Sequence, residues 1–208
     1  DLGLGGLAYG SVKLTQSGSQ TPVGSAKLTI RGLTRSGLIL TSTPVDLGLN
    51  LAVSSRNAAA RGVIKSTAGE TIGRFQGRVT GLGGGNWKNE LMRNPLFAEA
   101  RFNGAADSLW RLTGIEAFDL TGPVAVNAKI GGTLANPQIR GQLKTVNARL
   151  ESGLTGTVIS GIKAAGRFDG SRLVLPNVTG VTKGGGTVAG SGSFNFAVEP
   201  GVGVGITM

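Results

Sequence analysis

The sequence predicts an all-β protein: an antiparallel β-sheet with one apolar face and one or two short helices. Apolar and polar residues alternate along many short segments, which is the period of a half-buried strand. Glycine is abundant, at 37 of 208 residues, or roughly 18 % against an average near 7 %. Proline occurs only 7 times and apolar residues make up 39 % of the chain, so a disordered Pro/Gly linker is excluded.

The clearest alternating segment is 45–53. Its aliphatic positions are Val45, Leu47, Leu49, Leu51 and Val53, and the positions between them are small or polar. The same period recurs in segments 26–30, 75–79, 124–130, 139–143, 162–168 and 188–198. Strands of this design form antiparallel sheets with one apolar face, whereas buried parallel strands are continuously apolar. A second layer or a sheet folded upon itself could cover that face, and the period alone does not separate the two.

Turn and helix patterns divide the strands. Asp169-Gly170 predicts a two-residue hairpin, and breaks are expected at Asn136-Pro137 and at the glycines 184–186. Asn86 is expected to cap a short helix over 87–92, stopped by Asn94-Pro95. A second helix is expected over about 106–113, ended by Gly114. Both are too short to be stable alone, so each must pack against apolar surface.

The whole chain, 1–208, is interpreted as one segment. It divides loosely into a first strand set (1–84), a helix-containing insertion (85–122) and a second strand set (123–208). The first residue is Asp1 rather than Met, so a fragment or a processed chain is expected.

Several kinds of chemistry are excluded by composition. The chain has no histidine and no cysteine, which removes Ser-His-Asp arrangements, thiolates and the usual zinc ligands. The 11 carboxylates show no spacing that predicts a catalytic pair, and no Gly-Lys-Ser/Thr phosphate loop is present. We therefore expect no enzyme activity, no catalytic residues, no metal and no cofactor. No run of 18 apolar residues exists, so no transmembrane helix is expected.

The net charge of +10 comes from 21 Lys and Arg that are scattered singly along the chain. Nucleic-acid binding would need basic clusters and aromatic side chains for stacking, and aromatic residues make up only 5 % of the chain. Nucleic acid is therefore not an expected partner, and the cations are interpreted as a solvated sheet face.

Three phrases in the second half resemble a known family. They are residues 132–143 (GTLANPQIRGQL), 168–175 (FDGSRLVL) and 184–192 (GGGTVAGSG). Their order and spacing are similar to those of the TamB family, the AsmA-like inner-membrane subunit of the translocation and assembly module. The resemblance covers about residues 105–196, and the first half of the chain fits more loosely.

The resemblance implies a role that composition does not show. Such proteins form an elongated, curved antiparallel β-sheet folded into a taco-like groove with a hydrophobic interior, and they span the periplasm of Gram-negative bacteria. The resemblance therefore implies this fold, with one or two short helices, for the present chain. An N-terminal helix, not included in these residues, anchors the proteins of this family in the inner membrane. They pair with the outer-membrane barrel TamA and are implicated in outer-membrane protein assembly, protein secretion and phospholipid transport. The TamA-facing C-terminal segment of the family is not evident here.

The expected function is thus a non-catalytic hydrophobic groove in the periplasm. It would bind phospholipid acyl chains or unfolded β-strand clients, and TamA is a further candidate partner. The residues expected to line the groove share one parity within their strands: Val45, Leu47, Leu49, Leu51, Val53, Ile139, Leu143, Ile162, Phe168, Phe194 and Phe196. The alternative is a structural or adhesive β-solenoid with a closed core. An outer-membrane barrel is disfavoured, because barrels carry aromatic girdles and this chain has few aromatic residues.

Overall fold

The structure, a computed structural model, describes residues 4–18, 20–36, 42–110, 118–153, 155–195 and 204–207. Of these residues 71 % lie in strands and 7 % in helices, which confirms the all-β prediction. The strands are β1 Leu4–Thr15, β2 Val23–Arg35, β3 Val45–Val53, β4 Asn57–Ser66, β5 Thr71–Thr80, β6 Leu96–Ala105, β7 Asp119–Thr121, β8 Pro123–Gly132, β9 Pro137–Glu151, β10 Val158–Gly170, β11 Arg172–Thr182, β12 Thr187–Asn195 and β13 Val204–Thr207.

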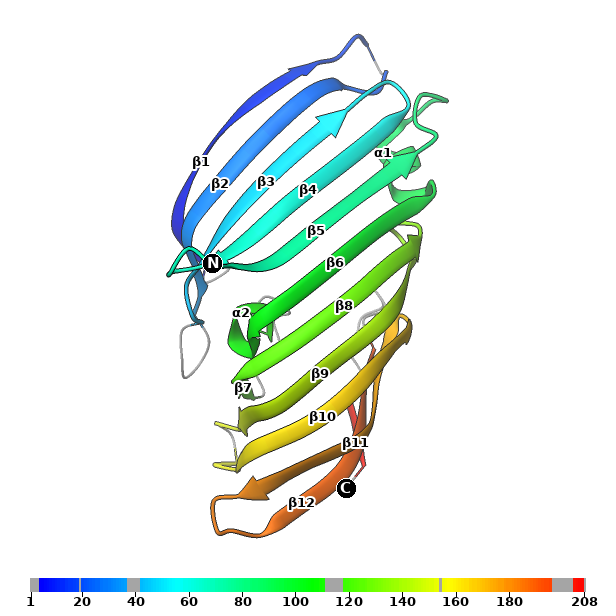
Figure 1. The fold of residues 1–208 in the computed structure, drawn as a ribbon. Helices are drawn as coiled ribbons and strands as arrows, with labels where there is room; N and C mark the ends of the chain where they lie inside the picture. Colours follow the sequence, from blue (N-terminus) through cyan, green and yellow to red (C-terminus); the bar gives the residue numbers. More distant parts are fainter. Residues whose placement is uncertain are drawn as a thin grey trace.

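One antiparallel sheet contains all of these strands. Its order is β1-β2-β3-β4-β5-β6-β8-β9-β10-β11-β12-β13, and the short β7 pairs with β9 off this path. Apart from β7, each strand therefore pairs with the strands before and after it in the chain, and the sheet is not closed into a barrel (Figure 1). Strand β6 lies inside the segment interpreted as an insertion, yet it is a central strand of the sheet, between β5 and β8.

The predicted turns lie between strands. Asn136-Pro137 lies at the β8–β9 turn, and the glycines 184–186 connect β11 to β12. The hairpin between β10 and β11 is shifted by one residue, because Asp169 pairs with Arg172 and leaves Gly170 and Ser171 as the loop. Gly170 has φ +65° and no described non-glycine residue has positive φ, which fits a type II′ turn with glycine first. The two-residue hairpin predicted here is therefore present, but Asp169 is the last paired residue before the loop rather than part of it.

Two short helices interrupt the strand succession. Helix α1 (Trp87–Arg93) is capped by Asn86, whose side chain accepts hydrogen bonds from the backbone N–H groups of Lys88 and Asn89 at 3.1 and 3.3 Å. It ends one residue later than predicted. Helix α2 (Ala106–Trp110) begins where predicted, and the rest of the predicted helix, with Gly114, lies outside the described residues.

The sheet is a single layer. The accessible surface is 12656 Å², whereas a compact monomer of 21.0 kDa exposes about 9000 Å². Among the residues that the structure describes, no large side chain is fully buried. Within the described residues no second sheet covers the apolar face, which is protected by the two helices and by the curl of the sheet itself.

Candidate functional site: an apolar groove

The pairing register aligns apolar side chains into rows that run across the strands. Residues directly opposite each other in an antiparallel pair lie on the same face of the sheet. One such row crosses from β2 to β12 and contains Leu28, Leu49, Gly62, Phe75, Ala100, Ala128, Gly141, Phe168, Leu173 and Phe194. No position in it has a polar side chain. We call the face that carries this row the inner face.

Two parallel rows flank the first. One contains Ile30, Leu47, Ile64, Gly73, Phe102, Val126, Leu143 and Gly166. The other contains Ala26, Leu51, Ala60, Gly77, Ala98, Ile130, Ile139 and Gly170. The three rows form an apolar band without a polar side chain from β2 to β10.

The predicted lining residues can now be placed. Leu47, Leu49, Leu51, Ile139, Leu143, Phe168 and Phe194 belong to the three rows. Val45 is opposite Leu33, Val53 is opposite Ala58, and Ile162 is opposite Ala148, so these three also face inward. Phe196 lies outside the described residues. That these side chains contact a lipid or a client remains a prediction.

Several inner-face residues were absent from the predicted set. Leu28, Phe75, Phe102 and Val126 belong to the same rows. These residues alternate with polar or small neighbours, as Leu47 and Leu49 do, so they could have been predicted from the sequence.

The inner face is open. Leu51 is 38 % exposed, and Leu49, Phe75 and Phe168 are only half-buried. Monomeric proteins seldom leave a contiguous apolar surface in water unless it binds something. The half-burial therefore distinguishes this lining from an ordinary dry core and indicates a binding surface.

Both helices pack on the inner face. Leu91 of α1 lies against the cluster of Val79, Leu82 and Leu96. In α2, Ala106 packs with Phe102 and Val124, and Leu109 lies against the same cluster. Each helix therefore covers one part of the band and leaves the rest accessible.

Helix α2 is also fixed to the connection between β2 and β3. The buried Asp107 carboxylate accepts a hydrogen bond from the backbone N–H of Thr43, and the Ser108 hydroxyl donates to the Thr43 carbonyl at 3.5 Å. These bonds satisfy polar groups that would otherwise be costly beside an apolar surface.

Trp110 shows that the sheet curls toward its inner face. Its ring stacks on Phe118 at 5.1 Å and meets Phe194 edge-on at 5.8 Å between ring centroids. Helix α2 follows β6 directly, whereas Phe194 is on β12, five strands further along the sheet. A flat sheet would separate these strands by about 24 Å, so the contact requires curvature, which makes the inner face concave.

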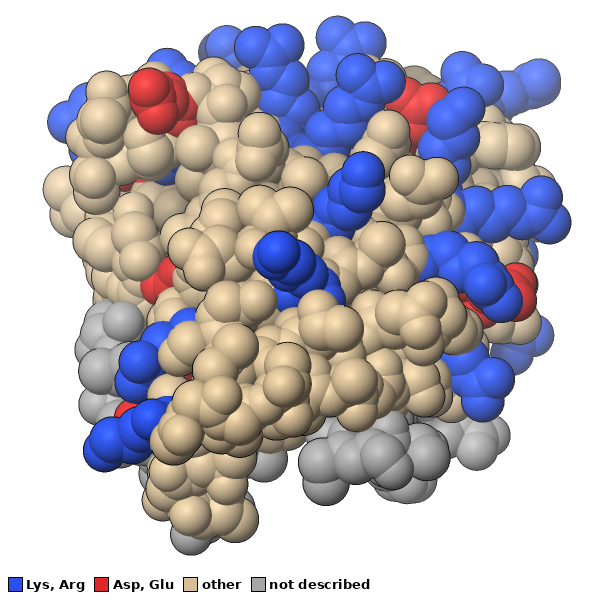
Figure 2. Space-filling model, turned by 60° about the horizontal axis from the view of Figure 1, so that its bottom comes forward, with Lys and Arg blue, Asp and Glu red and all other residues tan. Residues whose placement is uncertain are grey.

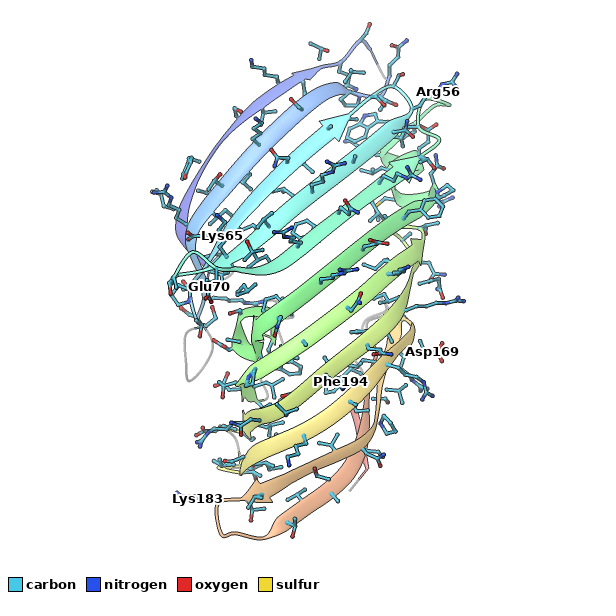
Figure 3. The ribbon with its side chains drawn as sticks, in the orientation of Figure 1. Arg56, Lys65, Glu70, Asp169, Lys183 and Phe194 are labelled. Atoms are coloured by element: carbon cyan, nitrogen blue, oxygen red, sulfur yellow. The ribbon has the colours of Figure 1, made fainter. Side chains whose placement is uncertain are left out.

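The groove thus has a floor of strands and two long rims where the strands turn. Figure 3 shows Arg56 and Asp169 along one rim and Lys65, Glu70 and Lys183 along the other, with Phe194 between them. Cargo lying across the strands would follow the apolar rows, parallel to these rims.

The described residues include no cluster of carboxylates that could hold a metal ion. None of their helices is long and apolar enough to cross a membrane. Comparison of the chain with family models, with curated proteins and with solved structures found no match.

Proposed function

We propose that this chain is a non-catalytic groove segment of a TamB-type bridge protein, which binds phospholipid acyl chains on its inner face. The observation that carries this proposal is the row of apolar side chains that runs unbroken from β2 to β12 and is half-buried at most of its positions, with Gly62, Ala128 and Leu173 buried. At about 4.8 Å per strand, the row is about 43 Å long, which exceeds the length of one acyl chain.

The lining suits a cargo that moves. Each buried methylene contributes about 0.8 kcal/mol, so partial burial of an acyl chain gives useful affinity. The three rows offer no hydrogen-bonding side chain that would fix a polar group at one position. A cargo held in this way can slide from strand to strand without breaking a specific contact.

An unfolded strand of an outer-membrane protein is the second candidate cargo. On the groove floor its backbone would find no free partners, because the strands there already pair on both sides, and unpaired backbone groups are costly. The edge strand β1 could supply such partners, since it has one neighbour and all its residues are exposed. The floor therefore favours lipid, and the edge favours polypeptide.

The proposed location is the periplasm, within a longer protein anchored in the inner membrane. It is supported by the three family-like phrases. They lie at or next to the β8–β9, β10–β11 and β11–β12 turns, three of the four hairpin turns between β8 and β12. A structural or adhesive solenoid would require a closed core, and the open antiparallel sheet favours the groove over that alternative.

A charge on the floor of the groove provides the test. We expect Leu49→Arg to lower the lipid retained per folded protein severalfold, because an unpaired charge opposes acyl-chain burial. The variant should remain folded, since the half-exposed position lets the guanidinium reach water. Lipid is measured by extraction and mass spectrometry, and folding by thermal melting.

The matched control is Ala52→Arg. Ala52 is exposed on the opposite face of the same strand, between Ser25 and Ala59, so an added charge there has no charged residue directly opposite it. Asn50 is less suitable because Lys27 and Arg61 lie directly opposite it. Equal lipid content in the parent and both variants would refute the groove as the cargo path.

A further inference from the structure

Cations that are scattered along the sequence gather on one face of the sheet. Every Lys and Arg of β4, β5, β6 and β8 alternates with the inner-face residues and is exposed on the opposite, outer face. Glu99 is the one carboxylate in these four strands, all of whose residues are described. In Figure 2 Lys and Arg side chains likewise outnumber Asp and Glu. We call the central group of outer-face cations the basic face: Arg61, Arg74, Arg78, Arg101, Lys129 and Arg140.

Two pairs in the basic face oppose like charges directly. Lys129 and Arg140 are Cα partners on β8 and β9, and carboxylates are next to them in that row, Glu99 on β6 and Asp169 on β10.

Arg74 and Arg101 are Cα partners on β5 and β6, an arrangement that destabilises a sheet. Their next neighbours in the row are Val63 and Asn127, so no carboxylate lies directly opposite either arginine. The nearest one in the sheet register, Glu99, is diagonal to Arg74 and faces it less closely than Arg101 does. Solubility requires cations on the surface but does not require them to face each other. The Arg74–Arg101 pair therefore favours an anionic partner from outside the sheet.

The surface between these cations is shallow and carries an aromatic ring. Two open depressions of about 460 and 430 Å³ lie among the outer-face side chains of β4, β5, β6 and β8. Phe97 lines the first, is 55 % exposed, and has the Arg78 guanidinium 5.7 Å from its ring centroid. Lys and Arg together with Phe, Trp or Leu are found on segments that lie at the interface of a bilayer.

We propose that the basic face docks on the surface of an anionic phospholipid bilayer. The cations cover five adjacent strands, about 19 Å across, so they form a two-dimensional array rather than a narrow channel. Arginine forms paired hydrogen bonds with phosphate oxygens, which suits headgroups. A single-stranded nucleic acid is a poorer fit, because it requires several stacking rings and Phe97 is the one aromatic residue on this face among the described residues of these five strands.

The docking face and the groove are opposite faces of one sheet. The proposal therefore holds whether the inner face binds lipid, polypeptide or nothing. If both proposals are correct, the outer face rests on the bilayer and the groove opens on the side of the sheet that faces away from it.

The test is co-sedimentation with phosphatidylcholine vesicles with and without phosphatidylglycerol. We expect binding that requires phosphatidylglycerol and weakens as salt shortens the screening length. The double variant Arg74→Gln with Arg101→Gln should lower the partition coefficient about 25-fold, at about fivefold per cation. It should melt at the same temperature as the parent or higher, because the opposed charges are gone.

The matched control is Lys88→Gln with Arg93→Gln in α1, which changes the net charge equally away from the basic face. It should lower binding less than twofold. Equal losses in both double variants would mean that only net charge matters and would overturn the proposal. Equal binding to vesicles with and without phosphatidylglycerol would mean that the protein adsorbs through its apolar face. Binding of single-stranded DNA in place of vesicles would mean that the anionic partner is a nucleic acid. Either result would overturn the proposal that the basic face docks on a bilayer.

Discussion

Two glycines of the central inner row occupy different environments. A Cβ on Gly62 would lie 2.1 Å from Cζ of Phe75, so the Phe75 ring lies across this glycine. A Cβ on Gly141 would lie 2.0 Å from the backbone oxygen of Asn127, and Gly141 has φ +152°. Aromatic rings laid over strand glycines compensate for the missing side chain. The space beside Gly62 is therefore occupied by the Phe75 ring, which can move, whereas the space beside Gly141 is occupied by the Asn127 backbone, which cannot.

These environments predict different effects of alanine. Gly62→Ala should destabilise the protein by less than about 1 kcal/mol, because the half-exposed Phe75 can swing into the open groove. Gly141→Ala should cost about 2 kcal/mol or more, because its backbone is strained and its neighbour cannot move away. Urea denaturation of both variants measures the difference. A larger loss at Gly62 would mean that the Phe75 ring is locked by cargo or by neighbours.

Alternation along the sequence predicts which way a side chain points but not which residues become neighbours. Leu49 and Phe168 were assigned to the apolar face from their own strands alone. Their place in one row depends on the register of every strand between them, and irregularities such as that between Ile64 and Lys65 in the β4–β5 pairing shift it. For the same reason Arg74 and Arg101, 27 positions apart in the chain, could not be recognised as a facing pair.

At the scale of elements, local chemistry determined α1. Asn86 supplies the cap, Glu90 lies in the first turn, and Asn94-Pro95 ends the helix. All of these are sequence-local, so the helix was predictable to within one residue. The contact of Trp110 with Phe194 was not predictable, because it depends on the curl of the sheet accumulated over several strands.

The cap predicts a measurable dependence of α1 on Asn86. Asn86→Ala removes the acceptor for two backbone N–H groups and should destabilise the protein by about 1 kcal/mol. Asn86→Asp keeps an acceptor and should be close to neutral. Chemical denaturation compares the two. Loss of α1 also frees Leu91 from its cluster, so Asn86→Ala should increase the binding of an apolar dye, and an unchanged signal would show that Leu91 stays in place.

At the scale of the whole molecule, one sheet separates two kinds of surface. The inner face is apolar and half-exposed, and the outer face is basic with few carboxylates. The accessible surface of 12656 Å², about 3600 Å² above that of a compact monomer, reflects this single-layer design. Because strand side chains alternate, a substitution at one position changes one face and leaves the other intact.

The two faces should therefore be separable by experiment. An uncharged apolar dye, which does not respond to the cations, should bind the folded parent and be displaced by a fatty acid. Leu49→Arg should weaken dye binding severalfold and leave the salt-sensitive binding to phosphatidylglycerol vesicles within about twofold, because Leu49 and the basic face are on opposite sides of the sheet. Arg74→Gln with Arg101→Gln should show the reverse pattern. If each variant impaired both measurements equally while remaining folded, vesicle and dye would share one surface, and the assignment of separate roles to the two faces would be wrong.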